Sequence, residues 1–516
     1  MKKVGLVLIM LSFVPACHQQ VEVKKYEPNW ESLSQWEMPQ WFDDAVLGIY
    51  CHWGVYSVPA FRFNDGAEQV DSGLWYGTFM YVPNDSDQPN YGVYDFHRKT
   101  YGDPAEFGYH DFVPMFKAEK WDPGRWAKLY KYAGADFAGV AAEHGDGFCL
   151  WDTEFDKYNC MDKGPRRDIL GEMFAAARKH GMKTIATFHE KPGEMFEAGR
   201  RYCPKGVGVN NPKYADLYEL TPHSVQNKKL LEVVDKYQPD QIWFEDEYCG
   251  QENWKDFIAY YYNSAEDWGK EVFISQKHDM APLSCSVFDI EGGIFPNGIW
   301  RWAGETEPQK QRWQKDVPIG NYWAYAHGVG CRPVNMLVDG IVDRISKNGV
   351  TLLDVAPKAD GTLPQAQING LKKLGKWMAV NKEALYAAKP APFAEGGVDT
   401  FKAGTLRFTE KGTYLYAIEL GNVWPPTVGF ADYKDSKPPR APFTIPGVKP
   451  IKGSEIRMLG SSKNLPWHQE GENVIIDELP DPLPCDYAWS FKIQLSDVKS
   501  AKKHASSPVS LEITRK

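Results

Sequence analysis

The feature that most constrains this fold is an alternation of short apolar segments with amphipathic helices between residues 36 and 390. Such alternation is typical of a parallel sheet, in which each helix returns the chain to the start of the next strand. The expected strands are residues 47–51, 137–142, 184–188, 241–244, 272–275, 286–288, 322–324 and 351–355. Eight parallel strands close a TIM barrel. The sequence therefore predicts an α/β fold with a TIM-like (β/α)8 barrel over residues 36–390.

Helices are expected directly before four of these strands. They are residues 124–132, 167–180, 223–237 and 333–347. Asn348 and Gly349 follow the last of them, and these residue types commonly end a helix because they tolerate a left-handed backbone. The helical segments thus support the assignment of the strands between them.

Beyond residue 390 the pattern changes to short β-like runs at 413–418, 456–459 and 474–476, separated by Pro, Gly and Asn. This pattern predicts a C-terminal antiparallel β-sandwich over residues 391–495. Residues 496–516 are rich in Lys and Ser and are expected to form a loose tail. A chain of 516 residues is long enough for a large domain and a smaller one.

The N-terminus resembles an export signal. Lys2 and Lys3 precede an apolar run over residues 4–14, which is too short to cross a bilayer and fits a signal-peptide core. The run ends in Val-Pro-Ala-Cys at residues 14–17, similar to a bacterial lipoprotein cleavage site, although Pro15 is unusual there. We expect a lipoprotein-type signal peptide over residues 1–17 and a tether over residues 18–35. The chain would be exported to the bacterial envelope, in the periplasm or at the cell surface, with a lipid anchor at Cys17 as its one membrane attachment. An ordinary secretory signal is the alternative.

Composition narrows the function further. A net charge of −9 argues against nucleic acid as a partner, because nucleic acid requires a basic surface. The sequence contains neither a P-loop nor a Gly-rich dinucleotide fingerprint. Aromatic residues make up 14% of the chain, which suits a carbohydrate-binding protein but also fits ordinary core packing. The sequence gives no indication of the oligomeric state.

Polar residues follow most of the expected strands. Because active-site residues of TIM barrels lie at the carboxyl ends of the strands, we expect these side chains to converge on one face. They are His52-Trp53, the segment from Glu143 to Phe148, His189-Glu190, Glu245-Asp246-Glu247, Lys277-His278-Asp279 and Asp289-Ile290-Glu291. A glycosidase needs two carboxyl groups that flank one bond, and this face offers several. Trp53 and Trp75 are candidates to wall the apolar side of a sugar.

A metal-dependent hydrolase is the rival interpretation of the same face. His52, His144 and His189 are possible zinc ligands together with one carboxylate. However, the sequence has no His-x-His or His-Glu-x-x-His spacing, and its nine Cys include no Cys-x-x-Cys pair. Each His taken alone also fits a structural role, whereas three at strand ends favour a functional one. We expect no metal.

Several motifs, taken in order, resemble those of the α-L-fucosidases of glycoside hydrolase family 29. The similarity covers roughly residues 40–390, and no single motif carries it. The segments are LGIYCHWGVYSVPA at 47–60, LWY at 74–76, EHGDGF at 143–148, GPRRD at 164–168, SKNG at 346–349 and PKADGT at 357–362.

The resemblance implies hydrolysis of terminal α-L-fucose from a glycan or polysaccharide, with retention of configuration. His52, Trp53, Trp75 and His144 would contact the sugar, and Lys277 falls where a cation often lines the pocket. No cofactor is implied, because both chemical steps need only carboxyl groups and water. The implied general acid/base is Glu291. The implied nucleophile follows Trp243 and Phe244, where Glu245 replaces the usual Asp and Asp246 comes next, so both acids are candidates.

Three departures from the family pattern affect the expected pocket. Gly145 replaces a second His, Leu74 replaces a Glu, and Glu143 replaces a Lys. His189 and Glu190 lie at the next strand end and are candidates to compensate, in a reshaped pocket or for a modified sugar. The alternative to an active fucosidase is a catalytically impaired, surface-anchored glycan-binding protein on the same scaffold. The acids retained at residues 245–247 favour catalysis.

Overall fold

The computed structural model describes residues 25–62, 71, 73–246, 248–278, 280–290, 310–391, 405–422 and 433–495. Its centre is an eight-stranded parallel sheet in the order β6-β5-β4-β3-β2-β1-β8-β7. The strands are β1 (Leu47–Cys51), β2 (Phe137–Glu143), β3 (Lys183–Phe188), β4 (Gln241–Phe244), β5 (Phe273–Gln276), β6 (Val287–Phe288), β7 (Trp313–Pro318) and β8 (Gly349–Val355). The two edges meet where Asp289, next to β6, forms a parallel bridge with Gln314 of β7. The predicted TIM-like barrel is confirmed.

Seven of the eight predicted strands match observed strands to within a residue or two. The remaining one, predicted at residues 322–324, is wrong. Residues 322–324 form no strand, and β7 lies at Trp313–Pro318 instead. The interior of this strand reads Gln-Lys-Asp, and all three side chains are buried. Gln314 accepts a hydrogen bond from Gln241 Nε2 at 3.0 Å inside the barrel. A strand whose buried face is polar lacks the apolar pattern by which strands are recognised.

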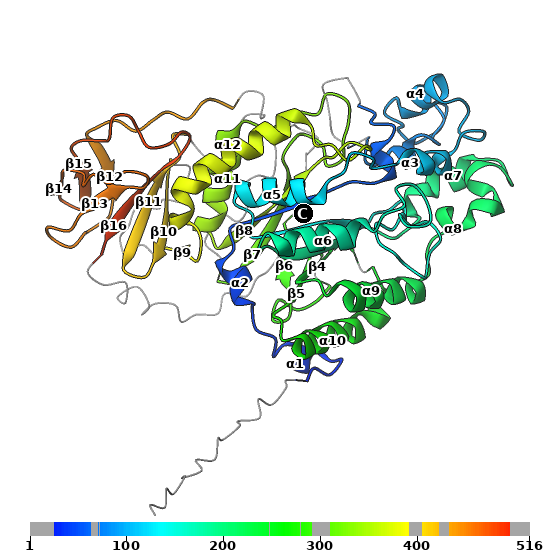
Figure 1. Cartoon of the computed structure of the whole chain (residues 1–516), viewed down its shortest axis with the longest axis horizontal. Coiled ribbons are helices and arrows are strands. Elements are labelled where there is room, and N and C mark those ends of the chain that lie inside the picture. Colours follow the sequence, from blue (N-terminus) through cyan, green and yellow to red (C-terminus); the bar gives the residue numbers. More distant parts are fainter. Residues whose placement is uncertain are drawn as a thin grey trace, which may run out of the picture.

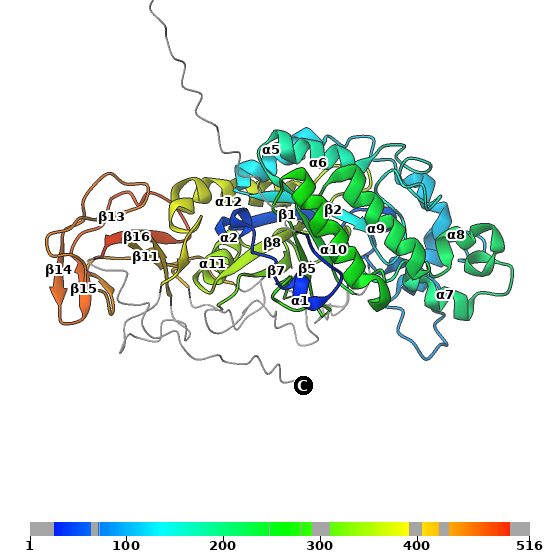
Figure 2. The same cartoon turned by 90° about the horizontal axis from the view of Figure 1, so that it is seen from below.

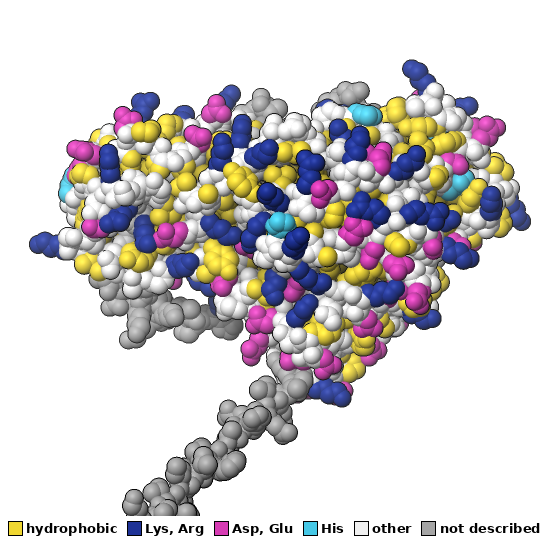
Figure 3. Space-filling view, viewed as in Figure 1, with side chains coloured by type: hydrophobic (Ala, Val, Ile, Leu, Met, Phe, Trp, Pro, Cys, Tyr) yellow, Lys and Arg dark blue, Asp and Glu magenta, His cyan; other side chains and the backbone are white. Residues whose placement is uncertain are grey.

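The helices cover the outside of the barrel (Figures 1 and 2). Figure 3 shows basic and acidic side chains interspersed on one outer face, as expected for helices that turn their apolar side to the sheet. The predicted helices before four strands are confirmed, and Asn348 has the left-handed backbone expected of a helix stop, with φ of 69°. The six longer helices are α5 (Pro123–Ala133), α6 (Ile169–Lys179), α9 (His223–Tyr237), α10 (Gln251–Trp268), α11 (Val334–Ser346) and α12 (Gln365–Asn381). The shorter helices are α1 (Trp30–Leu33), α2 (Gln40–Asp44), α3 (Tyr76–Phe79), α4 (Val93–Thr100), α7 (Glu197–Tyr202) and α8 (Ala215–Tyr218).

The amino-terminal side of the barrel is filled by an apolar cluster. Phe42 of α2 packs there with side chains of the strands, among them Phe137, Ile185 and Phe273. Two members of this cluster contact the histidines at the strand ends. The ring centroid of Tyr50 lies 5.4 Å from that of His52, and the ring centroid of Trp243 lies 4.5 Å from that of His189. Because apolar packing occupies this end, the functional groups gather at the carboxyl ends of the strands.

The C-terminal domain consists of two antiparallel sheets, at the left of Figure 1, and confirms the predicted β-sandwich. Strands of the five-stranded sheet, in the order β13-β16-β11-β10-β9, are β9 (Lys389–Pro390), β10 (Leu406–Lys411), β11 (Tyr414–Glu419), β13 (Ile456–Met458) and β16 (Trp489–Gln494). Those of the three-stranded sheet are β12 (Phe443–Ile445), β14 (Trp467–Glu470) and β15 (Asn473–Ile476). Phe408, Phe491, Val474 and Ile476 belong to one core that both sheets share.

The sandwich is joined to the barrel by a buried ion pair. Arg407 of β10 donates from Nε to Asp343 Oδ1 of α11 at 2.7 Å, and neither side chain is exposed. Thr409 of the same strand donates to the carbonyl oxygen of Ala384 at 2.6 Å. The two domains therefore share a polar contact that excludes water.

Part of the segment that was predicted to be a tether, residues 18–35, packs against the barrel. The Tyr26 amide donates to Asn263 Oδ1 of α10 at 2.7 Å, and Asn263 Nδ2 donates back to the Tyr26 carbonyl at 2.8 Å. Residues 25–35 thus belong to the folded part, which corrects the start of the barrel domain predicted at residue 36. The predicted signal peptide, the tether before residue 25 and the C-terminal tail lie outside the described residues. None of the helices in the described ranges combines the length and apolar character needed to cross a bilayer.

Candidate active site

Five of the predicted site residues each follow directly the last residue of a barrel strand. They are His52, His144, His189, Glu245 and Lys277, after β1, β2, β3, β4 and β5. Side chains alternate between the two faces of a strand, so Tyr50 and His52 share the barrel face, as do Trp243 and Glu245. This register brings the five side chains together, as the sequence predicts.

The three histidine rings form a compact cluster. Ring centroids are 5.5 Å apart for His52 and His144, 4.5 Å for His52 and His189, and 5.0 Å for His144 and His189. Burial, together with the neighbouring histidines, holds the pKa of both His52 and His144 well below its usual range. These imidazoles are therefore neutral at pH 7, and each can both donate and accept a hydrogen bond.

Glu245 is the predicted nucleophile that lies next to this cluster. Its Oε2 lies 3.0 Å from His189 Nδ1, and its Oε1 accepts a hydrogen bond from Lys277 Nζ at 2.9 Å. Burial opposes ionisation, but Lys277 and His189 outweigh it and hold the pKa of Glu245 well below its usual range. The side chain is 19% exposed, so an ionised carboxylate is held in position and remains reachable.

Asp246, the other candidate nucleophile, points elsewhere. Its side chain is 55% exposed and lies 3.7 Å from His278, which is 65% exposed. The structure therefore brings Glu245, and not Asp246, together with the histidines. The third predicted catalytic residue, Glu291, lies outside the described residues.

Aromatic side chains line one side of the histidine cluster. Trp75 lies with its ring centroid 6.0 Å from that of His144, as expected for a residue that contacts the sugar. Tyr56 lies 5.6 Å from His144 and Trp323 lies 5.4 Å from His52. Neither Tyr56 nor Trp323 was among the site residues predicted from the sequence. Trp323 lies in the loop after β7, whereas the sequence had placed it inside the predicted strand at 322–324.

Trp53 is placed differently from its predicted role as a sugar contact. Its ring is fully buried among Phe116, Trp121 and Trp126, with centroids 5.1–5.3 Å away, and Nε1 donates to the carbonyl oxygen of Lys358 at 2.8 Å. The reason is its position directly after His52, which turns its side chain to the opposite face of the strand. Trp53 packs the barrel against its surroundings and does not line the histidine cluster.

The three histidines do not fit a zinc site. Their ring nitrogens lie within 4.8 Å of one another, close enough to suggest one. However, Nδ1 of His189 is engaged by Glu245 and its Nε2 lies 2.8 Å from Thr187 Oγ1. His52 Nδ1 lies 3.0 Å from Asp354 Oδ1 of β8. A metal ion would have to break one of the two contacts of His189, and these contacts orient the imidazole ring without it.

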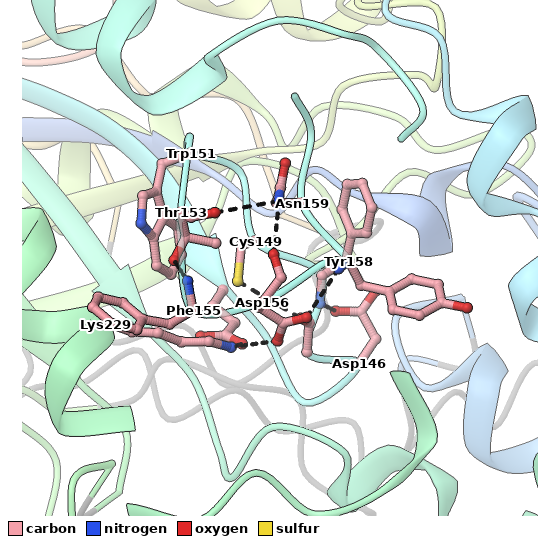
Figure 4. A network of polar contacts seen from close by, with 12 residues as sticks. Asp146, Cys149, Trp151, Thr153, Phe155, Asp156, Tyr158, Asn159 and Lys229 are labelled. Atoms are coloured by element: carbon pink, nitrogen blue, oxygen red, sulfur yellow. Dashed lines mark hydrogen bonds and ion pairs between the residues drawn. The ribbon is translucent and has the colours of Figure 1, made fainter. Parts of the chain in front are cut away.

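A buried polar network lies beneath His144. Lys229 of α9 donates from Nζ to Glu143 Oε1 at 2.8 Å and to Asp156 Oδ2 at 2.7 Å, and the Tyr248 hydroxyl donates to Glu143. Figure 4 shows Lys229 in contact with Asp156, which lies on the same loop as Cys149 and Tyr158. Glu143 is the last residue of β2, so the network fixes the backbone that presents His144.

A parallel barrel that places an ionised, partly buried carboxylate at a strand end, with the neutral imidazoles of His52 and His144 and indole rings beside it, is the arrangement of a glycoside hydrolase. Comparison with known sequences identifies the family. The profile described as alpha-L-fucosidase matches residues 13–383, and the chain belongs to this family.

Individual relatives agree with this assignment along most of the chain. The tissue alpha-L-fucosidase of Homo sapiens is 28% identical over 504 residues, covering 95% of this chain and 96% of the relative. That of Mus musculus is 29% identical over 486 residues, covering 91% and 95%. Among solved structures, the Thermotoga maritima alpha-fucosidase in complex with fucose superposes with a TM-score of 0.68 at 27% identity, covering 91% of this chain and 100% of that one.

Proposed function

We propose that this protein is a retaining exo-α-L-fucosidase that removes terminal α-L-fucosyl residues from a glycan or polysaccharide, with Glu245 as the nucleophile. The observation that carries the proposal is the placement of Glu245, ionised and held by His189 and Lys277 at the carboxyl end of β4. Holding a partly buried carboxylate in its charged form is costly, and attack on the anomeric carbon requires that form, whereas glycan binding alone does not. The glycan-binding alternative is therefore less well supported.

The chemistry follows from two carboxyl groups. A Glu245 oxygen attacks the anomeric carbon while the bond to the leaving oxygen breaks, and a general acid gives that oxygen a proton. The same acid then acts as a base on water, which releases fucose and frees Glu245. We assign the acid/base role to Glu291, as the family resemblance implies. His52 and His144 are suited to bind sugar hydroxyls because neutral imidazoles both donate and accept.

The decisive experiment is hydrolysis of an aryl α-L-fucoside by the wild-type enzyme. We expect release of the aryl group from the α-L-fucoside, none from the β-L-fucoside control, and α-L-fucose as the first product by proton NMR. Glu245 must be ionised to attack and its pKa lies well below 4.5, the ordinary Glu value. Activity should therefore persist as the pH falls to 4.5 unless another group fails first. Failure to cleave both aryl and natural α-L-fucosides would refute the proposal, and a β-configured first product would refute retention.

We further propose that the chain is exported and anchored to the bacterial envelope by a lipid on Cys17. The apolar run over residues 4–14 and the sequence at 14–17 support this, and both lie in the first 24 residues, outside the described ranges. Expression with labelled palmitate should label the wild type and not Cys17→Ser, which is expected in the soluble fraction. Equal labelling of the two proteins would contradict the anchor, and a shortened, unlabelled wild type would indicate an ordinary secretory signal.

A further inference from the structure

Glu190, the second residue after β3, lies over Gly145, the second residue after β2. A Cβ atom built on Gly145 would come within 3.0 Å of Glu190 Oε2. Glu190 Oε2 also lies 3.3 Å from His144 Nδ1. The missing side chain at residue 145 therefore leaves the space that the Glu190 carboxyl group occupies.

The backbone of Glu190 is strained. Its φ is 40°, in the left-handed region that a Glu residue rarely adopts. Such conformations are unfavourable and cluster at binding and catalytic sites. The strain directs the Glu190 side chain toward His144, which suggests a role beyond packing.

The Glu190 carboxyl group lacks a full set of partners. Among the described residues, neither Glu190 Oε2 nor His144 Nδ1 makes a well-aligned hydrogen bond, although both atoms are buried. Burial and the nearby charge of Glu245 raise the pKa of Glu190 well above its usual value, which favours the protonated form that can donate. Buried polar atoms of this kind usually have a partner, and a ligand is the natural candidate at this site.

The spacing of three groups defines that ligand. Polar atoms of His144, Glu190 and Glu245 lie within 4.8 Å of one another. An oxygen atom placed between these groups can reach all three at a normal hydrogen-bond distance of about 2.7–3.2 Å. Because Glu245 attacks the anomeric carbon under the proposed function, a hydroxyl that also contacts Glu245 must sit on the adjacent carbon of the sugar ring.

We propose that Glu190 is a substrate-binding residue that, together with His144, hydrogen-bonds the 2-hydroxyl group of the sugar, in the space left by Gly145. This inference rests on the proposed function, since Glu245 supplies the position of the anomeric carbon. It assigns Glu190 to specificity for an unmodified 2-hydroxyl and leaves proton donation to the leaving group with Glu291.

The test compares aryl α-L-fucosides with and without the 2-hydroxyl group. With the full substrate, Glu190→Ala should lower kcat/KM by about 10- to 100-fold, because a buried partner is left unsatisfied. With the 2-deoxy substrate, Glu190→Ala and the wild type should differ by less than about threefold, since the partner is already absent. Glu190→Gln retains a donor and should restore most of the activity. Glu194→Ala, an exposed acid on the same loop, is the matched control and should change neither value.

Gly145→Ala provides an independent check. Its Cβ atom should displace the Glu190 carboxyl group and lower activity on the full substrate, yet add little in the Glu190→Ala background, because coupled residues are not additive. An equal loss on both substrates would overturn the inference. So would a loss in Glu190→Gln as large as in Glu190→Ala and confined to poor leaving groups, which would make Glu190 the general acid.

Calorimetry with L-fucose and 2-deoxy-L-fucose separates this inference from the proposed function. If the wild type binds L-fucose but cleaves no fucoside, the proposed function fails and the affinities decide the role of Glu190. A weaker affinity of Glu190→Ala for L-fucose alone would support that role, and an equal loss for both sugars would reject it. If the wild type neither binds nor cleaves, both proposals fail.

Discussion

Glu245→Gln is expected to lower kcat for α-L-fucoside hydrolysis by about 10⁴-fold or more, because losing a covalent nucleophile is among the largest single-residue effects on an enzyme. The amide matches the carboxylate in shape and can still contact His189 and Lys277, whose present distances to Glu245 are 3.0 and 2.9 Å. It cannot form the glycosyl ester. The measurement is steady-state turnover of an aryl α-L-fucoside, with added azide to test whether a small external nucleophile restores cleavage.

Asp246→Asn is the matched control for this prediction. The two acids are adjacent, but the Asp246 side chain is 55% exposed and contacts His278 instead of the histidine cluster. We expect less than a threefold change in kcat/KM, in the range of a weak surface ion pair. Full loss of activity in Asp246→Asn with activity retained in Glu245→Gln would exchange the two assignments.

The second large effect concerns stability. Lys229→Ala should lower the free energy of unfolding of the barrel by about 3–5 kcal/mol, the usual result of removing one partner from a buried charge network. The Lys229 side chain has no exposed surface, and its loss leaves Glu143 and Asp156 without the cation that both now contact. Urea denaturation followed by tryptophan fluorescence measures the change. Activity should also fall, because Glu143 directly precedes His144.

Lys236→Ala tests whether the effect comes from burial or from any lysine of α9. Lys236 lies on the same helix and pairs with Glu232 at 3.1 Å, but it is 34% exposed. Its loss should cost no more than about 1 kcal/mol, as for other surface pairs. The double variant Lys229→Met with Glu143→Gln should recover part of the stability lost in Lys229→Ala. Equal destabilisation by the two single lysine substitutions would contradict the role of the buried network.

The sequence allowed the barrel, the sandwich and most of the strand ends to be predicted, because apolar periodicity and helix signals are local. Five site residues could be identified because each directly follows a strand, so locating the end of the strand was enough to find them. They are His52, His144, His189, Glu245 and Lys277. The pattern failed at β7, whose buried residues are polar, and with it Trp323 was missed. Trp53 was misplaced because a single residue of register decides which face of a strand a side chain takes.

The choice between Glu245 and Asp246 could not be made from sequence for the same reason. Glu245 occupies the position of the usual Asp, but Asp246 is the residue of the usual type, and only the folded strand shows that Glu245 faces the histidines. The placement of Glu190 depends on three segments that meet in space. No pattern along the chain connects Gly145, Glu190 and Glu245, so their relation needed the folded structure.

The buried contact between Arg407 and Asp343 affects how the chain can be divided. The sandwich sheet begins with β9 (Lys389–Pro390), yet a cut before this strand would leave the buried Asp343 side chain of α11 without its guanidinium partner. The two domains are thus separate in topology but not in thermodynamics. When two related sequences are recombined, we expect the chimera to fold only if α11 and β10 come from the same parent, because the Arg407–Asp343 pair joins them. Barrel and sandwich are therefore expected to be exchanged together.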